Sequence, residues 1–296
     1  MKTYIDCIPC FFRQALDAAR LCTNNELVHK EILEKTAAMI KDISMEKSPP
    51  EFAQNMYAMI NETTLNPDPF KEMKMKYNSL AMELYPELKE RVRKSDDPFL
   101  TAVRVAIAGN IIDFATGMKF NLRDEVEKAL RMDFSIDHTD SLRKLVNDAE
   151  HILYIGDNCG ETAFDRVFIE TIDKEVTYAV RDIPIINDAT LDDALYCGLD
   201  TCATLISSGS KTPGTVLELC SDEFKELYYD ADLIISKGQG NFETMSDNLE
   251  NIVFLLRVKC SVIGDKSGCN IGDIICKFNN FIKLFIKFLT AHPKNC

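Results

Sequence analysis

Four short segments in the second half of the chain concentrate polar side chains directly after apolar runs. They span residues 156–161, 181–190, 207–214 and 236–243. Asp157 and Asn158 in the first segment and Asp188 in the second offer only oxygen ligands, which suit a hard ion such as Mg²⁺ or Mn²⁺. Gly-containing turns that open helices expose backbone N–H groups to phosphate oxygens. A divalent ion beside such turns, with Lys237 adding positive charge, indicates hydrolysis of a phosphoester.

Each of these features also has a structural interpretation. An Asp-Asn pair after a strand commonly caps a helix or closes a turn, because both side chains accept bonds from nearby N–H groups. A lysine such as Lys237 commonly lies on the solvated surface. The convergence of all four segments therefore favours a functional site more than any one of them does.

Several familiar sites are excluded by spacing. An aspartyl-phosphate hydrolase needs a second Asp two residues after Asp157, where this chain has Cys159. Gly238-Gln239-Gly240 resembles the start of the dinucleotide-binding motif Gly-x-Gly-x-x-Gly, but residue 243 is glutamate where that motif has its final glycine. The chain contains neither a Gly-Lys-Ser/Thr phosphate loop nor a Gly-x-Ser-x-Gly elbow. Its four histidines are too far apart in sequence for a zinc motif.

Cys7 and Cys10 form a Cys-x-x-Cys motif ahead of a helical pattern, with Pro9 in its first turn. A thiolate near a helix N-terminus has a lowered pKa, so the pair predicts a redox centre or part of a second metal site. Buried structural thiols are the alternative.

Asn110 and Asp113 lie three residues apart in an apolar helical segment and therefore on one face of the helix. Buried polar groups need partners. The two side chains therefore either cap a neighbouring segment or reach the predicted metal site.

The elements that must position these residues differ on either side of residue 145. Before it, apolar residues recur at helical spacing and predict a mostly helical region over 1–145. After it, short apolar runs alternate with amphipathic segments, which predicts an α/β domain over 146–296 with helices on both faces of a parallel sheet. Ligands of such sheets bind beyond the carboxyl ends of the strands. The predicted strands are His151–Ile155, Glu175–Val180, 203–206, 232–235 and either 251–256 or 260–263.

Residues 278–289 predict a further, amphipathic helix. Its apolar side chains share one face, with Lys283 and Lys287 opposite. A basic amphipathic helix can lie on a membrane. Docking on its own domain is the favoured interpretation.

Composition narrows the classes of partner. The 296 residues allow about two domains, and 34 basic against 47 acidic residues give a net charge of −13, which disfavours nucleic acid as a partner. Eleven scattered cysteines and an N-terminus without a signal-peptide pattern predict a reducing, cytoplasmic location. No run approaches the roughly 18 apolar residues of a membrane span, so none is expected.

From about residue 3 to residue 275 the sequence resembles the family first described as domain of unknown function 89, now known as damage-control, metal-dependent phosphatases. The cysteine pair is similar to that of its smaller prokaryotic or archaeal branch. The matching motifs are Cys7-x-x-Cys10, Asp68-Pro69-Phe70 with Lys74 and Tyr77-Asn78, Gly109-Asn110-x-x-Asp113, Gly156-Asp157-Asn158-x-Gly160-Glu161, Asn187-Asp188-Ala189-Thr190, the loop 209–214, Lys237-Gly238 with Asn241 and Glu243, and Lys259-Cys260.

The resemblance implies a three-layer α/β/α domain with a helical N-terminal region and one divalent cation (Mn²⁺, Co²⁺, Ni²⁺ or Mg²⁺) held by Asp157, Asn158 and Asp188. It implies hydrolysis of a small phosphorylated metabolite, such as a sugar phosphate, by a metal-activated water. Asp157, Asp188 and Glu161 form the expected catalytic group, with Glu161 as a helper base or orienting residue. The residues expected to bind substrate or phosphate are Lys237, Ser208, Gly209, Arg181, Asn110, Asp113, Asn241 and Glu243.

Two other functions remain open from the sequence. One is a thiol or zinc-binding redox or scaffold protein centred on Cys7 and Cys10, in which the strand-end loops are structural turns. The other is a sensor that binds the phosphorylated metabolite and metal without hydrolysis.

Overall fold

A seven-stranded sheet forms the centre of the protein in this computed structural model, which describes residues 1–111 and 122–279. The strand order is β1-β7-β6-β5-β2-β3-β4. Strands β2 to β6 are parallel, β7 is antiparallel to β6, and β1 is parallel to β7. The predicted α/β class with a mainly parallel sheet is confirmed. The strands are β1 (Phe134–Asp137), β2 (His151–Ile155), β3 (Glu175–Val180), β4 (Thr204–Ser207), β5 (Leu233–Lys237), β6 (Ile252–Arg257) and β7 (Ile274–Phe278).

The predicted strands match β2 and β3 and lie within two residues of the bounds of β4, β5 and β6. The alternative strand at 260–263 is wrong, because this stretch enters a helix after β6. Two strands were not expected. β1 is a short edge strand with half-exposed side chains. β7 includes Phe278, which the sequence predicts at the start of a terminal helix. Residue 279 is a bend that follows β7, and residues 280–289 of that predicted helix lie outside the described residues.

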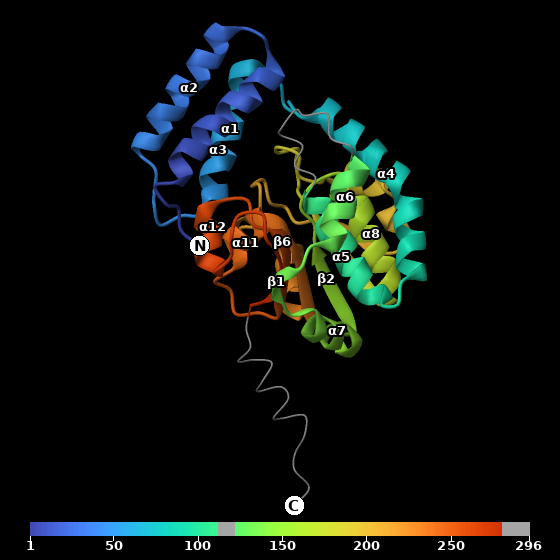
Figure 1. The fold of residues 1–296 in the computed structure, drawn as a ribbon. Helices are drawn as coiled ribbons and strands as arrows, with labels where there is room; N and C mark the ends of the chain where they lie inside the picture. Colours follow the sequence, from blue (N-terminus) through green and yellow to red (C-terminus); the bar gives the residue numbers. More distant parts are fainter. Residues whose placement is uncertain (112–121, 280–296) are drawn as a thin grey trace, which may run out of the picture.

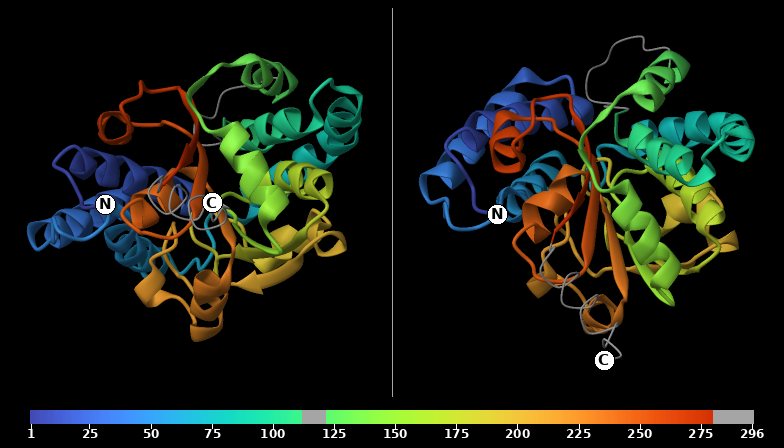
Figure 2. Two further views of the ribbon diagram at one scale, coloured as in Figure 1. Left: turned by 90° about the horizontal axis from the view of Figure 1, so that it is seen from below. Right: turned by 60° about the horizontal axis from the view of Figure 1, so that its bottom comes forward.

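Helices cover both faces of the sheet (Figure 2). Successive side chains of a strand point to opposite faces. Ile152 and Tyr154 of β2 therefore pack with α5, α7 and α8, while Leu153 and Ile155 pack with α10 and α11. The helices are α1 (Cys7–Cys22), α2 (Glu26–Lys41), α3 (Pro49–Thr64), α4 (Lys71–Lys94), α5 (Pro98–Ile111), α6 (Leu122–Arg131), α7 (Thr139–Asp148), α8 (Glu161–Ile172), α9 (Leu191–Tyr196), α10 (Asp222–Asp230), α11 (Gly238–Met245) and α12 (Ser261–Ser267).

The helices before residue 145 contribute to two hydrophobic cores. Side chains of α1, α2 and α3 form a core of their own, and α3 contacts α11. Helices α4, α5 and α6 instead join the core on one face of the sheet. Figure 1 shows α1 to α3 together on one side of the molecule and α4, α5 and α8 on the other. No helix in the described ranges is long and apolar enough to cross a membrane.

The strand order places a topological switch point between β2 and β5. From β2 the chain proceeds through β3 to β4 on one side, and from β5 to β6 on the other. Loops that leave the carboxyl ends of such neighbouring strands diverge and leave a crevice, where ligands of open α/β sheets bind. Asp157 follows β2 and Gly238 follows β5. The fold therefore places two of the predicted polar segments at this switch point, on the same edge of the sheet.

Gly109 allows α5 to pack closely against α8, which carries part of the candidate site. A Cβ atom at residue 109 would lie 3.1 Å from the Cβ atom of Phe164 and 3.3 Å from the Cα atom of Glu161. We expect Gly109→Val to lower the free energy of unfolding by about 1–3 kcal/mol, because overpacking strains a close-packed core. Chemical denaturation measures this change. Ala37→Val, on an exposed face of α2, is the control for β-branching in a helix, and an equal effect of both variants would contradict the prediction.

Candidate active site

Three buried carboxylates lie at the carboxyl end of the sheet. Asp157 follows β2, Glu161 begins α8, and Asp188 lies in the loop after β3. Backbone hydrogen bonds join the two loops: Ala189 N–H donates to the Asp157 carbonyl at 2.8 Å, and Asn158 pairs with Asp188 in an isolated β-bridge. The structure therefore brings together all of the predicted catalytic residues and the predicted metal ligands.

Two amides hold the carboxylates in place. Asn110 Nδ2 donates to Asp157 Oδ2 at 3.0 Å and to Glu161 Oε1 at 2.8 Å. Asn158 Nδ2 donates to the same two oxygens at 2.9 and 2.5 Å. Asn110 comes from α5, so its side chain does reach the site from the helical half of the chain. Asp113, predicted on the same helix face, lies outside the described residues.

The cluster carries more negative charge than its surroundings favour. Burial raises the pKa of Asp157 well above its ordinary value, and the nearby charges of Glu161 and Asp188 raise it further. Burial also raises the pKa of Asp188, although Arg181 acts in the opposite direction. Burial without enough opposite charge disfavours ionised carboxylates. A bound cation would stabilise their ionised forms.

The donor set fits a hard divalent cation. Asp157, Asn158 and Asp188 offer carboxylate and amide oxygens, and Gly238 leaves room for the carboxylate of Asp157: a Cβ at residue 238 would lie 1.8 Å from Asp157 Oδ2. Gly238 has a φ of +78°, which also favours glycine. Within residues 1–111 and 122–279, no three His, Cys, Asp or Glu side chains are arranged to hold a metal. The predicted site accordingly depends on an asparagine.

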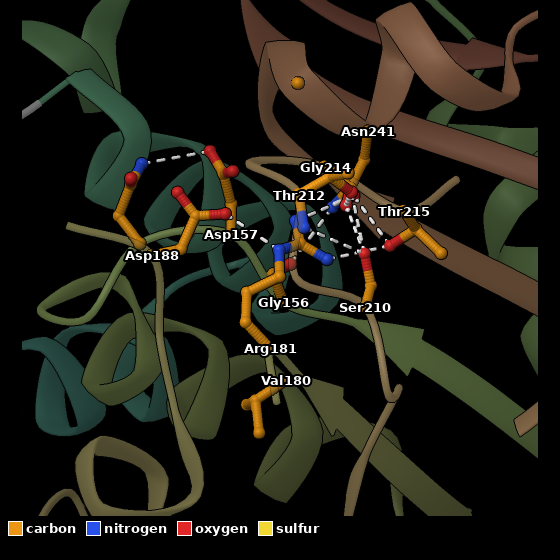
Figure 3. Close-up of polar contacts among 12 residues, drawn as sticks. Gly156, Asp157, Val180, Arg181, Asp188, Ser210, Thr212, Gly214, Thr215 and Asn241 are labelled. Carbon is orange, nitrogen blue, oxygen red and sulfur yellow. Dashed lines mark hydrogen bonds and ion pairs between the residues drawn. The ribbon is translucent and has the colours of Figure 1, made fainter. Parts of the chain in front are cut away.

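Arg181 and Asn241 link the site to the loop that carries Thr215 and to helix α11. Figure 3 shows the Arg181 guanidinium between Asp188, whose Oδ2 accepts from Nε at 2.7 Å, and the side chains of Thr215 and Asn241, at 2.8 and 2.9 Å. Asn241 Nδ2 donates to the carbonyls of Gly156 and Lys237 at 3.0 and 2.8 Å. Both predicted substrate-binding residues thus lie at the site and fix its loops to one another.

Lys237 lies beneath the carboxylates and is fully buried. Its Nζ donates to Asp165 Oδ1 at 2.6 Å, to the Ala106 carbonyl at 2.7 Å and to Glu161 Oε2 at 3.1 Å. Burial alone would lower the pKa of Lys237, but the two carboxylates raise it above its ordinary value. An ammonium group has three N–H donors. No N–H donor of Lys237 is left for a phosphoryl oxygen, which argues against the predicted contact with phosphate.

Ser208 and Gly209 shape the loop after β4. Ser208 is buried, and its hydroxyl donates to the Val180 carbonyl at 2.8 Å. Gly209 has a φ of +71°, and a Cβ there would lie 2.6 Å from the backbone nitrogen of Ser221. Both residues therefore have a structural reason for their presence, beside the phosphate contact that the sequence predicts.

Glu243 lies away from the carboxylates, near the thiols of Cys7, Cys10 and Cys260. Gln239 Nε2 donates to Glu243 Oε1 at 2.9 Å and to Cys260 Sγ at 3.5 Å. Burial raises the pKa of Cys7 and Cys10, and the charge of Glu243 raises both further. The predicted lowering of the thiol pKa is therefore wrong, because burial and the nearby Glu243 carboxylate raise the pKa of both thiols. Every cysteine in the described ranges is a free thiol.

Asp165 is a buried residue of the site that was not identified from the sequence. Asp165 accepts hydrogen bonds from the hydroxyls of Tyr154 and Tyr178 at 2.6 and 2.8 Å, in addition to Lys237. Its position four residues after Glu161 on an apolar helix is the signal that could have revealed it. The charge of Lys259, after β6, lowers the pKa of Asp157 and so acts on the same cluster.

The comparisons with known proteins agree with this geometry. Residues 3–275 match the damage-control phosphatase ARMT1-like domain. The chain belongs to this family. It is 35% identical over 288 residues to a damage-control phosphatase of Pyrococcus horikoshii, covering 95% of this chain and 99% of that protein. It is 32% identical over 287 residues to a damage-control phosphatase of Archaeoglobus fulgidus, covering 94% and 99%.

A solved structure supports the same assignment. The crystal structure of a DUF89 family protein from Pyrococcus horikoshii matches with a TM-score of 0.87 at 35% identity, covering 95% of this chain and all of that one. The resemblance found in the sequence is thus confirmed. Membership of the family and the names of these relatives support a phosphatase role.

Glu243 predicts a pH dependence of stability. Burial raises its pKa from 4.5 to about 7, and the bond from Gln239 only partly offsets this. Because the folded-state pKa is raised, the stabilisation is present below about pH 4.5 and is lost as the pH rises to 7, by up to about 3 kcal/mol. Glu243→Gln keeps the acceptor but does not titrate. Its free energy of unfolding should therefore rise relative to wild type over this range.

Denaturant unfolding at pH 4.5, 6, 7 and 8 measures this difference. Glu226→Gln, at an exposed position of α10, is the control and should stay parallel to wild type. A constant difference between Glu243→Gln and wild type across the range would contradict the assignment.

Proposed function

We propose that the protein is a metal-dependent phosphatase that hydrolyses small phosphorylated metabolites, such as sugar phosphates. The observation that carries the proposal is the buried group of Asp157, Glu161 and Asp188 at the switch point of the sheet. A cluster of buried carboxylates at the strand ends, in which Asp157 and Asp188 have raised pKa values, is typical of a site built around a bound cation.

In this proposal Asp157, Asn158 and Asp188 hold one Mn²⁺, Co²⁺, Ni²⁺ or Mg²⁺ ion. When bound, such an ion favours deprotonation of water and neutralises charge on the phosphoryl oxygens. Arg181 fixes the orientation of Asp188 through the 2.7 Å bond from Nε. Asn110 does the same for Asp157 from α5. The two carboxylates therefore keep their positions without rearrangement when substrate binds.

Glu161 is the proposed base. Both of its oxygens are held, Oε1 by the two amides and Oε2 by Lys237 at 3.1 Å. A carboxylate fixed in this way can accept a proton from the attacking water as the water oxygen bonds to phosphorus, and it can return that proton to the alkoxide oxygen released when the ester P–O bond breaks. Lys237 thus acts in this proposal as a positioning residue for Glu161, in place of the predicted contact with phosphate.

The thiol alternative has less support than the phosphatase. The raised pKa values of Cys7 and Cys10 favour protonated thiols, which are poor nucleophiles and poor metal ligands. The non-catalytic sensor uses the same loops as the phosphatase. Release of phosphate distinguishes the sensor from the enzyme.

Metal-stripped protein should release phosphate from sugar phosphates only after Mn²⁺, Co²⁺, Ni²⁺ or Mg²⁺ is restored. Asp157→Ala should lower the restored rate at least about 100-fold, because it removes a ligand and an acceptor of two amides. Phosphate release under matched metal concentrations is the measurement.

Two controls accompany this experiment. Asp182→Ala changes an exposed aspartate in the loop after β3 and should keep the wild-type rate. The double variant Cys7→Ser, Cys10→Ser should also keep it. Metal-independent release, or an unchanged rate in Asp157→Ala, would sink the proposal, and metal-dependent binding of sugar phosphate without release would favour the sensor.

A further inference from the structure

A side-chain cation can supplement the divalent ion at the substrate phosphate, but Lys237 and Arg181 are both held by carboxylates of the site. All three donors of Lys237 are bonded within the protein. Arg181 is buried, and three of its five N–H donors bond to Asp188, Thr215 and Asn241. A further buried cation, Lys74 of α4, has a different environment.

We infer that Lys74 and Asn78 of α4 form a substrate subsite, in which Lys74 binds a phosphoryl oxygen and Asn78 accepts a hydrogen bond from a hydroxyl of the same substrate. This inference rests on the proposed function and extends it to the class of substrate. The ligand it requires is a phosphate monoester that carries hydroxyl groups near its phosphate.

Lys74 is only 4% exposed, yet it has a single side-chain partner within the described ranges. That partner is Asp193, whose Oδ2 lies 2.7 Å from Lys74 Nζ. Two of the three ammonium donors therefore remain for a ligand. Buried donors without partners are costly. A phosphoryl oxygen is a suitable acceptor for them.

Asn78 supplies a second, independent indication of a ligand. It lies one turn after Lys74 on the same face of α4 and is also 4% exposed. Its Nδ2 donates to Asp193 Oδ1 at 2.8 Å, which fixes the orientation of the amide. Its Oδ1 is buried without a hydrogen-bond partner. An unpartnered acceptor of this kind suits a hydroxyl donor of a ligand.

Contacts with both metal-ligand loops place Lys74 beside the carboxylates. The carbonyl of Lys74 lies 4.0 Å from the Sγ of Cys159, next to Asn158 in sequence. Asp193 accepts bonds from the backbone and the hydroxyl of Thr190 at 2.8 and 2.7 Å, two residues after Asp188. The charge of Lys74 also lowers the pKa of Asp188. Helix α4 thus reaches the loops that carry Asp157 and Asp188.

Lys74→Met in the Mn²⁺-loaded enzyme tests the phosphoryl contact. We expect the KM for a hexose phosphate and the inhibition constant of inorganic phosphate to rise at least about tenfold, as for loss of a charge-assisted hydrogen bond. Lys74→Arg should recover part of the loss. Lys71→Met, an exposed charge on the same helix, is the matched control and should leave both constants unchanged.

Loss of one partner from a buried ion pair is strongly destabilising. The double variant Lys74→Met, Asp193→Asn removes both charges and keeps an oxygen for Thr190, so it tests the same contact in a folded protein. Unchanged KM and phosphate inhibition in a folded variant would overturn the inference. A fall in kcat with unchanged KM would also overturn it. So would a tenfold rise of KM in Lys259→Met that is absent from the Lys74 variants.

Asn78→Ala tests the hydroxyl contact. Its KM for a hexose phosphate should rise while its KM for 4-nitrophenyl phosphate, which has no hydroxyl group, stays near wild type. Equal effects on both substrates would overturn this part. If wild-type protein releases no phosphate with any metal, the proposed function fails. Calorimetric binding of inorganic phosphate to Mn²⁺-loaded wild type and Lys74→Met then tests the phosphoryl contact alone.

Discussion

The ion pairs of Lys237 with Asp165 and Glu161 are the interaction on which the arrangement of the site depends. All three side chains are buried, and a buried charge is tolerated only with partners and satisfied hydrogen bonds. Lys237 meets this condition through contacts of 2.6 and 3.1 Å to the two carboxylates and 2.7 Å to α5. The ammonium thus joins β5, α8 and α5 at one point, and it fixes the position of Glu161 Oε2.

The topology explains why these charges meet. Strands β2 and β5 are neighbours, but the chain continues from β2 toward one edge of the sheet and from β5 toward the other. The loops that follow the two strands therefore lie opposite each other at the switch point. Gly238 lets this approach become close enough for the Asp157 carboxylate to lie against the backbone after β5. The side-chain amides of Asn110 and Asn158 then bridge Asp157 and Glu161, because each amide nitrogen donates to both carboxylates. Glu161 has donors to both oxygens, and Asp157 and Asp188 each have donors to Oδ2, so every carboxylate is held in a defined position.

Local patterns predicted much of this arrangement. The strands β2 and β3 and the meeting of Asp157, Asn158 and Asp188 follow from short apolar runs and from the rule that parallel strands end at one edge. Partners that are distant in sequence were not predictable. The burial of Lys237 depends on a carbonyl 131 residues earlier in the chain, and β7 depends on pairing with β6. The thiol pKa values were mispredicted for a related reason, because burial by the folded chain raises them most and Glu243, far from Cys7 in sequence, raises them further.

The helical region before the sheet is part of the site rather than an attachment to it. Helix α5 supplies Asn110 to the carboxylates, and α4 supplies Lys74 and Asn78 to the loops around them. The loops after the strands present carboxylates, which suit a cation, and α4 adds Lys74, whose ammonium has one side-chain partner within the described residues. In the proposed site, binding of an anionic substrate therefore depends on residues from both parts of the fold. It follows that a change in the packing of α4 against α8 and α9 should alter substrate affinity before it alters the carboxylate cluster.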